Sequence, residues 1–183
     1  MKNFIFIARA GQGAKSAANV LAKSAALQGL MIQEFPEYGP ERMGAPVKSY
    51  VKIDNKPIRD FSPILKPDFV VLIDKTLINL VLSLDLKNAV LVINDTCMPQ
   101  KYVDKYKLKN KIAVIDASKI SLESIGLDKP SIPMIGSLLK FENSIKIESV
   151  NKIIKQFFES AGKEKVVESN IKAIKECYKG VNL

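Results

Sequence analysis

The residues of this chain best suited to chemistry lie in a glycine-containing turn near its beginning. Gly11 and Gly13 follow the apolar run Phe4–Ala8 and precede a stretch with apolar residues at helical spacing, Ala14–Gln28. A turn of this kind leaves the first amide groups of the helix unpaired at the positive end of its dipole. Such a place suits a phosphate or a carboxylate. The candidate anion-binding residues are Arg9, Gly11, Gln12, Gly13, Lys15 and Ser16.

The same turn has a simpler interpretation. Glycine lacks a Cβ atom and allows tight turns, so Gly11 and Gly13 could serve only to connect a strand to a helix. The pattern AGQG matches neither GxGxxG nor GxxxxGK[ST], because Lys15 comes two residues after the last glycine. Both interpretations remain open from the residues alone.

A second glycine-containing segment, residues 36–46, is expected to form a shaped loop, because its three prolines and two glycines disfavour regular structure. The groups it would display are Tyr38, Glu41 and Arg42. A planar guanidinium such as that of Arg42 can bind a phosphate or carboxylate in two places. Glu41 and Arg42 could equally pair with neighbouring groups to hold the shape of the loop, or contact another subunit.

The rest of the composition narrows the possible chemistry. Histidine is absent and there are only two cysteines, Cys97 and Cys177. The chain therefore cannot supply four thiolates to an iron–sulfur cluster or a closed zinc site, and it lacks the usual general base. We interpret Cys97 as a small apolar residue, not a nucleophile. If the protein takes part in catalysis, the chemistry belongs to a cofactor or to another subunit.

The net charge of +9 raises the question of nucleic-acid binding. The lysines, however, are spread along the whole chain among acidic and apolar residues, as on a solvated surface. No helix-turn-helix, zinc-finger or aromatic–basic motif accompanies them, so nucleic acid is not an expected partner. No apolar run is long enough to cross a membrane, and we expect a soluble, cytoplasmic protein.

Alternating strand and helix signals position these residues. We expect a mainly parallel α/β sheet with helices on both faces. The chain is expected to form a single domain, with a sheet core over 1–145 and C-terminal helices over 146–183 packed on it or on a partner. The expected strands are 4–8, 30–35 (ended by Pro36), 47–53 (half exposed and antiparallel), 68–74, 89–93 and 112–116, and the expected helices are 14–28, 76–84, one that begins near Pro133, 148–160 and 163–179.

Asp74 closes one of the expected strands. Carboxylates at the carboxyl ends of parallel strands line the usual binding crevice of α/β sheets. Asp74 is therefore a candidate site residue, although capping a helix that starts at Thr76 is the role that we favour.

Several motifs together resemble a known family. The chain carries RAGQGAKSA at 9–17, FPEYGPERMGAPVKSYVKID at 35–54, KPDFVVLID at 66–74, IPMIGSLLK at 132–140 and ESNIKAIKECYKG at 168–180. In these it resembles the gamma subunit of the 2-oxoacid:ferredoxin oxidoreductases, in the branch that handles pyruvate or 2-ketoisovalerate. Ala8 and Ala10 stand where many members carry glycine, and Met43 stands where arginine is frequent.

The resemblance implies a Rossmann-like αβα chain within a complex of alpha, beta and delta-type subunits. Such a complex decarboxylates a 2-oxoacid on thiamine diphosphate, passes electrons through iron–sulfur clusters to ferredoxin and releases acyl-CoA. Thiamine and the clusters would belong to the partner subunits, whereas this chain would cover the active site and help to accommodate coenzyme A. A free-standing nucleotide-binding α/β protein is the alternative. Our hypothesis is that the first glycine turn holds the phosphate region of CoA, with Tyr38, Glu41 and Arg42 on the facing loop.

Overall fold

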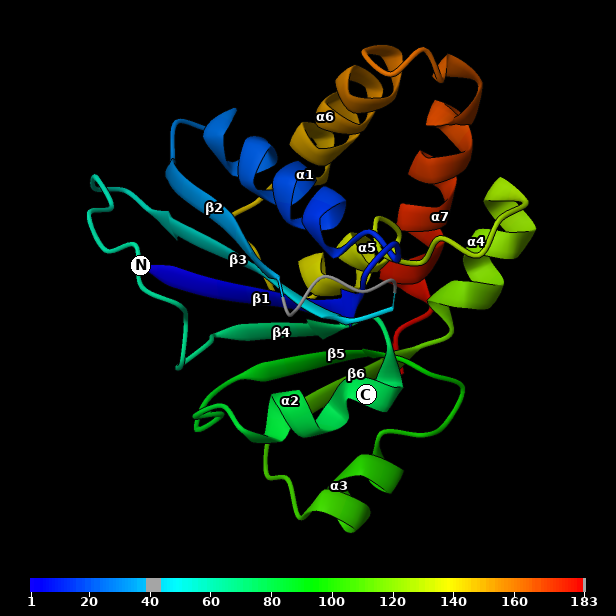
Figure 1. The fold of residues 1–183 in the computed structure, drawn as a ribbon. Helices are drawn as coiled ribbons and strands as arrows, with labels where there is room; N and C mark the ends of the chain where they lie inside the picture. The colour runs from blue at the N-terminus through cyan, green and yellow to red at the C-terminus, as the bar shows by residue number, and fades with distance from the viewer. Residues whose placement is uncertain (39–43, 183) are drawn as a thin grey trace.

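The computed structural model describes residues 1–38 and 44–182, and these form a mixed sheet between two layers of helices (Figure 1). The strands are β1 (Lys2–Arg9), β2 (Met31–Tyr38), β3 (Pro46–Asp54), β4 (Phe69–Leu72), β5 (Val90–Asn94) and β6 (Lys111–Ile115). Over the described residues they form a six-stranded sheet in the order β2-β3-β1-β4-β5-β6. Only β3 runs against its neighbours, and β1, β4, β5 and β6 are parallel. The expected mainly parallel α/β sheet is confirmed.

Helices cover both faces of the sheet. They are α1 (Ala14–Ala26), α2 (Ile78–Leu82), α3 (Gln100–Tyr106), α4 (Ala117–Ile125), α5 (Met134–Leu139), α6 (Ile147–Glu159) and α7 (Val167–Lys179), with short 3-10 turns η1 (Lys75–Leu77) and η2 (Glu164–Val166) before α2 and α7. Figure 1 shows α1, α5, α6 and α7 on one side of the sheet and α2 and α3 on the other. None of the helices in the described part of the chain is long and apolar enough to cross a membrane.

The two faces of the sheet build two apolar cores. Phe4 and Phe6 of β1 point into the core beneath α1, whereas Ile5 and Ile7 point into the core beneath α2, and all four are fully buried. Such burial on both faces explains why β1 reads as a continuous apolar run. On the α1 side, the stripe of small residues predicted from their spacing is confirmed as buried: Ala14, Ala17, Ala18, Leu21, Ala22 and Ala25.

Two expectations about the β2–β3 hairpin are wrong. Strand β2 does not end at Pro36 but continues to Tyr38, with Pro36 paired to Ser49. Proline is tolerated there because β2 is an edge strand, where an amide can be missing on the open side. The irregular segment is correspondingly shorter than 36–46, since β3 already begins at Pro46.

Strand β3 is antiparallel, as predicted, but it is largely buried and not half exposed. Its alternating pattern misleads because Lys52 is an inward-facing residue whose side chain is only 2% exposed. The Nζ atom of Lys52 donates to the carbonyl oxygen of Asp60 at 2.7 Å and to its carboxylate at 2.9 Å. A buried ammonium group requires such partners, and the segment after β3 provides them.

The C-terminal helices pack on the body of the domain. Helix α6 contacts α1, and α7 contacts α4 and α5. Gly136 makes the α5–α7 approach possible, because a Cβ atom there would lie 2.0 Å from the carbonyl oxygen of Ile174. Met134 and Leu138 of α5 are fully buried, as predicted, and Gly162 separates α6 from η2 and α7. The tail therefore forms one side of the molecule next to α1.

Candidate functional site

The glycine turn joins β1 to α1 and is open to solvent. Gly11 and Gly13 have φ angles of 92° and 89°, in the left-handed region that favours glycine. Gly13 is the N-cap of α1, and no side chain caps the helix. The amides of the first helical turn have no partner within the helix, and both Gly11 and Lys15 at this turn are exposed. The turn thus has the open amide groups that the anion hypothesis requires.

Arg9, the last residue of β1, ties the turn to two other segments. Its Nη1 donates to the carbonyl oxygen of Gly44 at 3.1 Å, its Nη2 donates to the Thr76 hydroxyl at 2.8 Å, and its Nε lies 3.2 Å from Oδ2 of Asp74. A guanidinium has five N–H groups, so these contacts leave two for another acceptor. The side chain remains 40% exposed. Arg9 therefore anchors the turn and still presents donors to solvent.

Gln12 and Asp74 complete this network. Gln12 accepts a hydrogen bond from the Arg9 amide at 2.7 Å and donates from Nε2 to Oδ2 of Asp74 at 3.0 Å. Asp74 also accepts from the Thr76 amide at 2.9 Å as the N-cap of η1, which confirms the capping role predicted for it. Burial acts to raise the pKa of Asp74, but its hydrogen bonds with Thr76 and Gln12 and the charge of Arg9 outweigh this and lower the pKa.

The network lies at the point of the sheet where the helices that follow neighbouring strands pack on opposite faces. After β1 the chain forms α1 on one face, and after β4 it forms α2 on the opposite face. Strands β1 and β4 are parallel neighbours, so their carboxyl ends lie side by side. Ligands of open α/β sheets bind at such a switch point. Here the Arg9–Gln12–Asp74–Thr76 network links the two strand ends.

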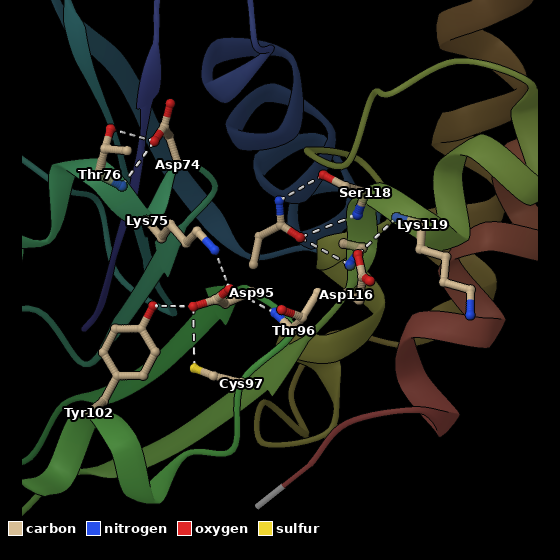
Figure 2. A network of polar contacts seen from close by, with 12 residues as sticks. Asp74, Lys75, Thr76, Asp95, Thr96, Cys97, Tyr102, Asp116, Ser118 and Lys119 are labelled. Atoms are coloured by element: carbon tan, nitrogen blue, oxygen red, sulfur yellow. Dashed lines mark hydrogen bonds and ion pairs between the residues drawn. The ribbon is translucent and has the colours of Figure 1, made fainter.

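A second network, which the sequence analysis missed, surrounds Asp95 just beyond β5 (Figure 2). Its carboxylate accepts hydrogen bonds from the Lys75 ammonium, the Thr96 amide, the Cys97 thiol and the Tyr102 hydroxyl. The Asp95 side chain is 8% exposed. Burial acts to raise its pKa, but the hydrogen bonds from Lys75 and the other donors prevail and hold the pKa at about 2. The available signal was its position directly after a buried strand, close to the position that Asp74 has two residues after β4.

The surroundings of the two cysteines disfavour their thiolate forms. Burial, together with the hydrogen bond that its thiol donates to Asp95 at 3.2 Å, raises its pKa above the ordinary value. Cys177 is fully buried, and burial raises its pKa to about 12. Both shifts favour the protonated thiol near neutral pH. The interpretation of Cys97 as a small apolar residue stays a prediction, and the structure adds a polar contact of its thiol with Asp95.

The remaining polar groups at the carboxyl edge cap helix α4. Asn94 accepts from the amides of Ala117 and Ser118 at 3.0 and 3.2 Å, and Asp116 accepts from the Lys119 amide at 2.9 Å (Figure 2). These side chains satisfy the first amides of α4. Asn94 and Asp116 therefore have a structural role.

Over residues 1–38 and 44–182, no group of three or more acidic, cysteine or histidine side chains could hold a metal ion.

A cleft of about 520 Å³ opens beside the glycine turn. Gly11, Gln12, Gly13 and Ser16 form one side of it, and residues of the 125–132 and 157–170 segments form the other. The structure thus brings most of the first predicted set to one opening, with Lys15 exposed on the adjacent surface. Sequence reasoning did not find the far side, which comes from segments more than a hundred residues away.

The structure describes only part of the second predicted set of site residues, Tyr38, Glu41 and Arg42. Tyr38 is the last residue of β2, and its side chain lies outside the described structure. Glu41 and Arg42 lie outside the described residues altogether. Their proposed place opposite the glycine turn therefore stays a prediction. The end of their loop is fixed near the turn, because the Ala10 amide donates to the Ala45 carbonyl at 2.8 Å.

Comparisons with known proteins cover nearly the whole chain. The family model described as pyruvate ferredoxin/flavodoxin oxidoreductase matches residues 3–180. The pyruvate/ketoisovalerate oxidoreductases common subunit gamma of Pyrococcus furiosus is 39% identical over 176 residues, which cover 94% of this chain and 93% of that protein. The pyruvate synthase subunit PorC of Thermotoga maritima is 36% identical over 174 residues, with 94% and 91% covered.

Solved structures agree with this fold. The crystal structure of the pyruvate oxidoreductase subunit PORC of Thermotoga maritima superposes with a TM-score of 0.86 at 33% identity, over 99% of this chain and 97% of that one. A 2-oxoglutarate:ferredoxin oxidoreductase of Magnetococcus marinus contains a similar fold, with a TM-score of 0.81 and 17% identity. The match covers 97% of this chain and 31% of that longer one.

Proposed function

The chain belongs to the pyruvate ferredoxin/flavodoxin oxidoreductase family, as one of its gamma subunits, and from that premise we propose that it helps to accommodate coenzyme A in the assembled enzyme. The complete enzyme would decarboxylate pyruvate or 2-ketoisovalerate oxidatively, form acyl-CoA and pass electrons to ferredoxin. Alpha, beta and delta-type partners would hold thiamine diphosphate and the iron–sulfur clusters. This chain would cover the active site and contribute no catalytic residue.

The open glycine turn is the observation that carries the CoA assignment. Its uncapped amides lie at the positive end of a helix of 13 residues and border a cleft. Gly13 also packs directly against Ser131, since a Cβ atom there would lie 2.5 Å from the hydroxyl oxygen of Ser131. Backbone amides at a helix N-terminus are a recurrent site for phosphate. These features suit the phosphate groups that CoA carries.

The surrounding side chains would orient the same phosphates. Lys15 is exposed beside the turn and Ser16 borders the cleft. Arg9 keeps two N–H groups beyond those that bind Asp74, Thr76 and Gly44. In this proposal Gln12 holds the turn in shape through Asp74. Tyr38, Glu41 and Arg42 would close the site from the facing loop or contact a partner subunit.

Isolation of the complex from the native cell tests this function. A tagged chain should bring down partner subunits together with thiamine diphosphate and iron, and the purified chain alone should not turn over a 2-oxoacid. The proposal would be contradicted if the chain were recovered without partners, or if it were active by itself.

A further inference from the structure

We propose that the loop of residues 55–68 is a docking surface for a different subunit of the oxidoreductase complex, one that offers an apolar depression bordered by carboxylates. Phe61 and Leu65 are the apolar anchors of this surface, and Arg59 is its charged contact. This inference rests on the subunit role in the proposed function and not on the CoA assignment.

The 55–68 loop lies at the edge of the sheet opposite to the glycine turn. Strand β3 is antiparallel to β1, so its last residues lie beside the start of β1, where Ile53 pairs with Lys2. The loop joins this end of β3 to the start of β4 (Figure 1). It contains no helix or strand. Loops of this length without secondary structure are uncommon in compact domains and often serve a function.

Three contacts hold the 55–68 loop on the domain. The buried Lys52 ammonium donates both to the carbonyl oxygen and to the carboxylate of Asp60. Ile64 is buried in the apolar core beneath α2. The carbonyl oxygen of Leu65 accepts a hydrogen bond from the Asp85 amide at 2.9 Å. Because a buried ammonium group is costly without its partners, the loop is held in place from beneath before any other protein binds.

The same loop exposes two large apolar side chains between its fixed points. Phe61 follows Asp60 and is 75% exposed, and Leu65 follows Ile64 and is 69% exposed. Each comes directly after a residue that is fixed on the domain, so the loop holds both side chains outward. Aromatic side chains are enriched in protein interfaces, and anchors that are already ordered lose little conformational entropy on binding. The loop therefore has the features of a preorganised interface.

The charges of this surface favour a different, acidic subunit over a second copy of the chain. The acidic residues in and around the loop already have partners within the chain: Asp54, Asp60, Asp68 and Asp85. Arg59 and Lys56 are exposed and form no ion pair with any acidic residue in the described part of the chain. A second copy docked through the same surface would bring like charges together. Carboxylates on another subunit would instead pair with them.

Recovery of the complex from the native cell tests this docking surface. Tagged full-length variants replace the native chain, and the partner subunits that carry thiamine diphosphate and iron are measured per tagged chain after dilution at low and high salt. The variants are Phe61→Ser and Arg59→Glu. Leu122→Ser is the matched control, because Leu122 is 52% exposed on α4 and lies outside the loop. All three positions are exposed, so the melting temperatures of the purified chains should match that of wild type.

We expect Phe61→Ser to lower the recovery of partner subunits by roughly tenfold, the effect of losing one interface anchor. The loss with Arg59→Glu should be largest at low salt, where charges are screened least. Leu122→Ser should recover as much partner as wild type.

Two results would overturn the docking surface while leaving the proposed function intact. One is normal partner recovery by folded Phe61→Ser and Arg59→Glu chains, and the other is an equal loss in Leu122→Ser. A purified chain that forms a dimer, which Phe61→Ser breaks without changing partner recovery, would assign the loop to a second copy and also overturn the inference. If the wild-type chain recovers no partner subunits, the proposed function fails as well.

Discussion

The Nε atom of Arg9 lies 3.2 Å from Oδ2 of Asp74, and the same oxygen accepts a hydrogen bond from Gln12 at 3.0 Å. One carboxylate at the end of β4 thus holds both ends of the turn that follows β1. The conformation of the glycine turn therefore depends on a residue more than sixty positions away, and Asp74 is a positioning residue for the candidate site.

Replacement of Asp74 by alanine should destabilise the protein. The change removes the acceptor of Gln12 and Thr76 and leaves Arg9 without its counter-charge, so we expect the free energy of unfolding to fall by roughly 2 kcal/mol. Urea denaturation measures the loss. Asp128→Ala is the matched control, because Asp128 is exposed and has no hydrogen-bond partner within the described structure. An equal effect of the two substitutions would argue against the network.

The two glycines of the turn should differ in their tolerance of alanine. Both have positive φ, so each substitution carries backbone strain of about 1 to 2 kcal/mol. Only Gly13→Ala also drives a Cβ atom against the Ser131 hydroxyl, whereas nothing lies within 4 Å of the position at Gly11. We expect Gly13→Ala to lower the melting temperature more than Gly11→Ala, and Ser131→Ala to recover part of the difference. No recovery in the double variant would contradict this geometry.

Stability should depend on Asp95 in a defined acid range. Its folded pKa of about 2 lies below the ordinary value, so its contribution is complete above that value and is lost as the pH falls toward 2. At pH 7 we expect Asp95→Asn to reduce the free energy of unfolding by about 2 kcal/mol. The gap between variant and wild type should narrow when urea denaturation is repeated near pH 3. A gap that stays constant with pH would show that the carboxylate charge is not the cause.

The fold was predictable because its main signals are local. The continuous apolar run of β1 and the alanine spacing of α1 reflect burial that each element imposes on its own residues. The prediction went wrong at β2 and β3, where burial depends on distant partners. Pro36 is tolerated because β2 is an edge strand, and the buried ammonium group of Lys52 has Asp60 as its partner.

The candidate site was predictable on one side. The spacing of Gly11, Gly13 and the following helix identified the open amides, since a turn and its helix are adjacent in the sequence. Ser131 and Lys163 could not be found in this way. Ser131 precedes α5 and Lys163 follows α6, so both come near the turn only through tertiary packing such as that of α6 on α1, which no local pattern encodes.

The affinity of the assembled enzyme for CoA tests the central claim most directly. Equilibrium binding should be compared for wild type, Lys15→Ala and Arg9→Ala, with Lys23→Ala on the exposed last turn of α1 as control. We expect the first two variants to raise the dissociation constant of CoA by roughly tenfold or more. Lys23→Ala and decarboxylation of the 2-oxoacid itself should be nearly unaffected. Unchanged CoA affinity in both Lys15→Ala and Arg9→Ala would contradict the placement of the carrier at the glycine turn.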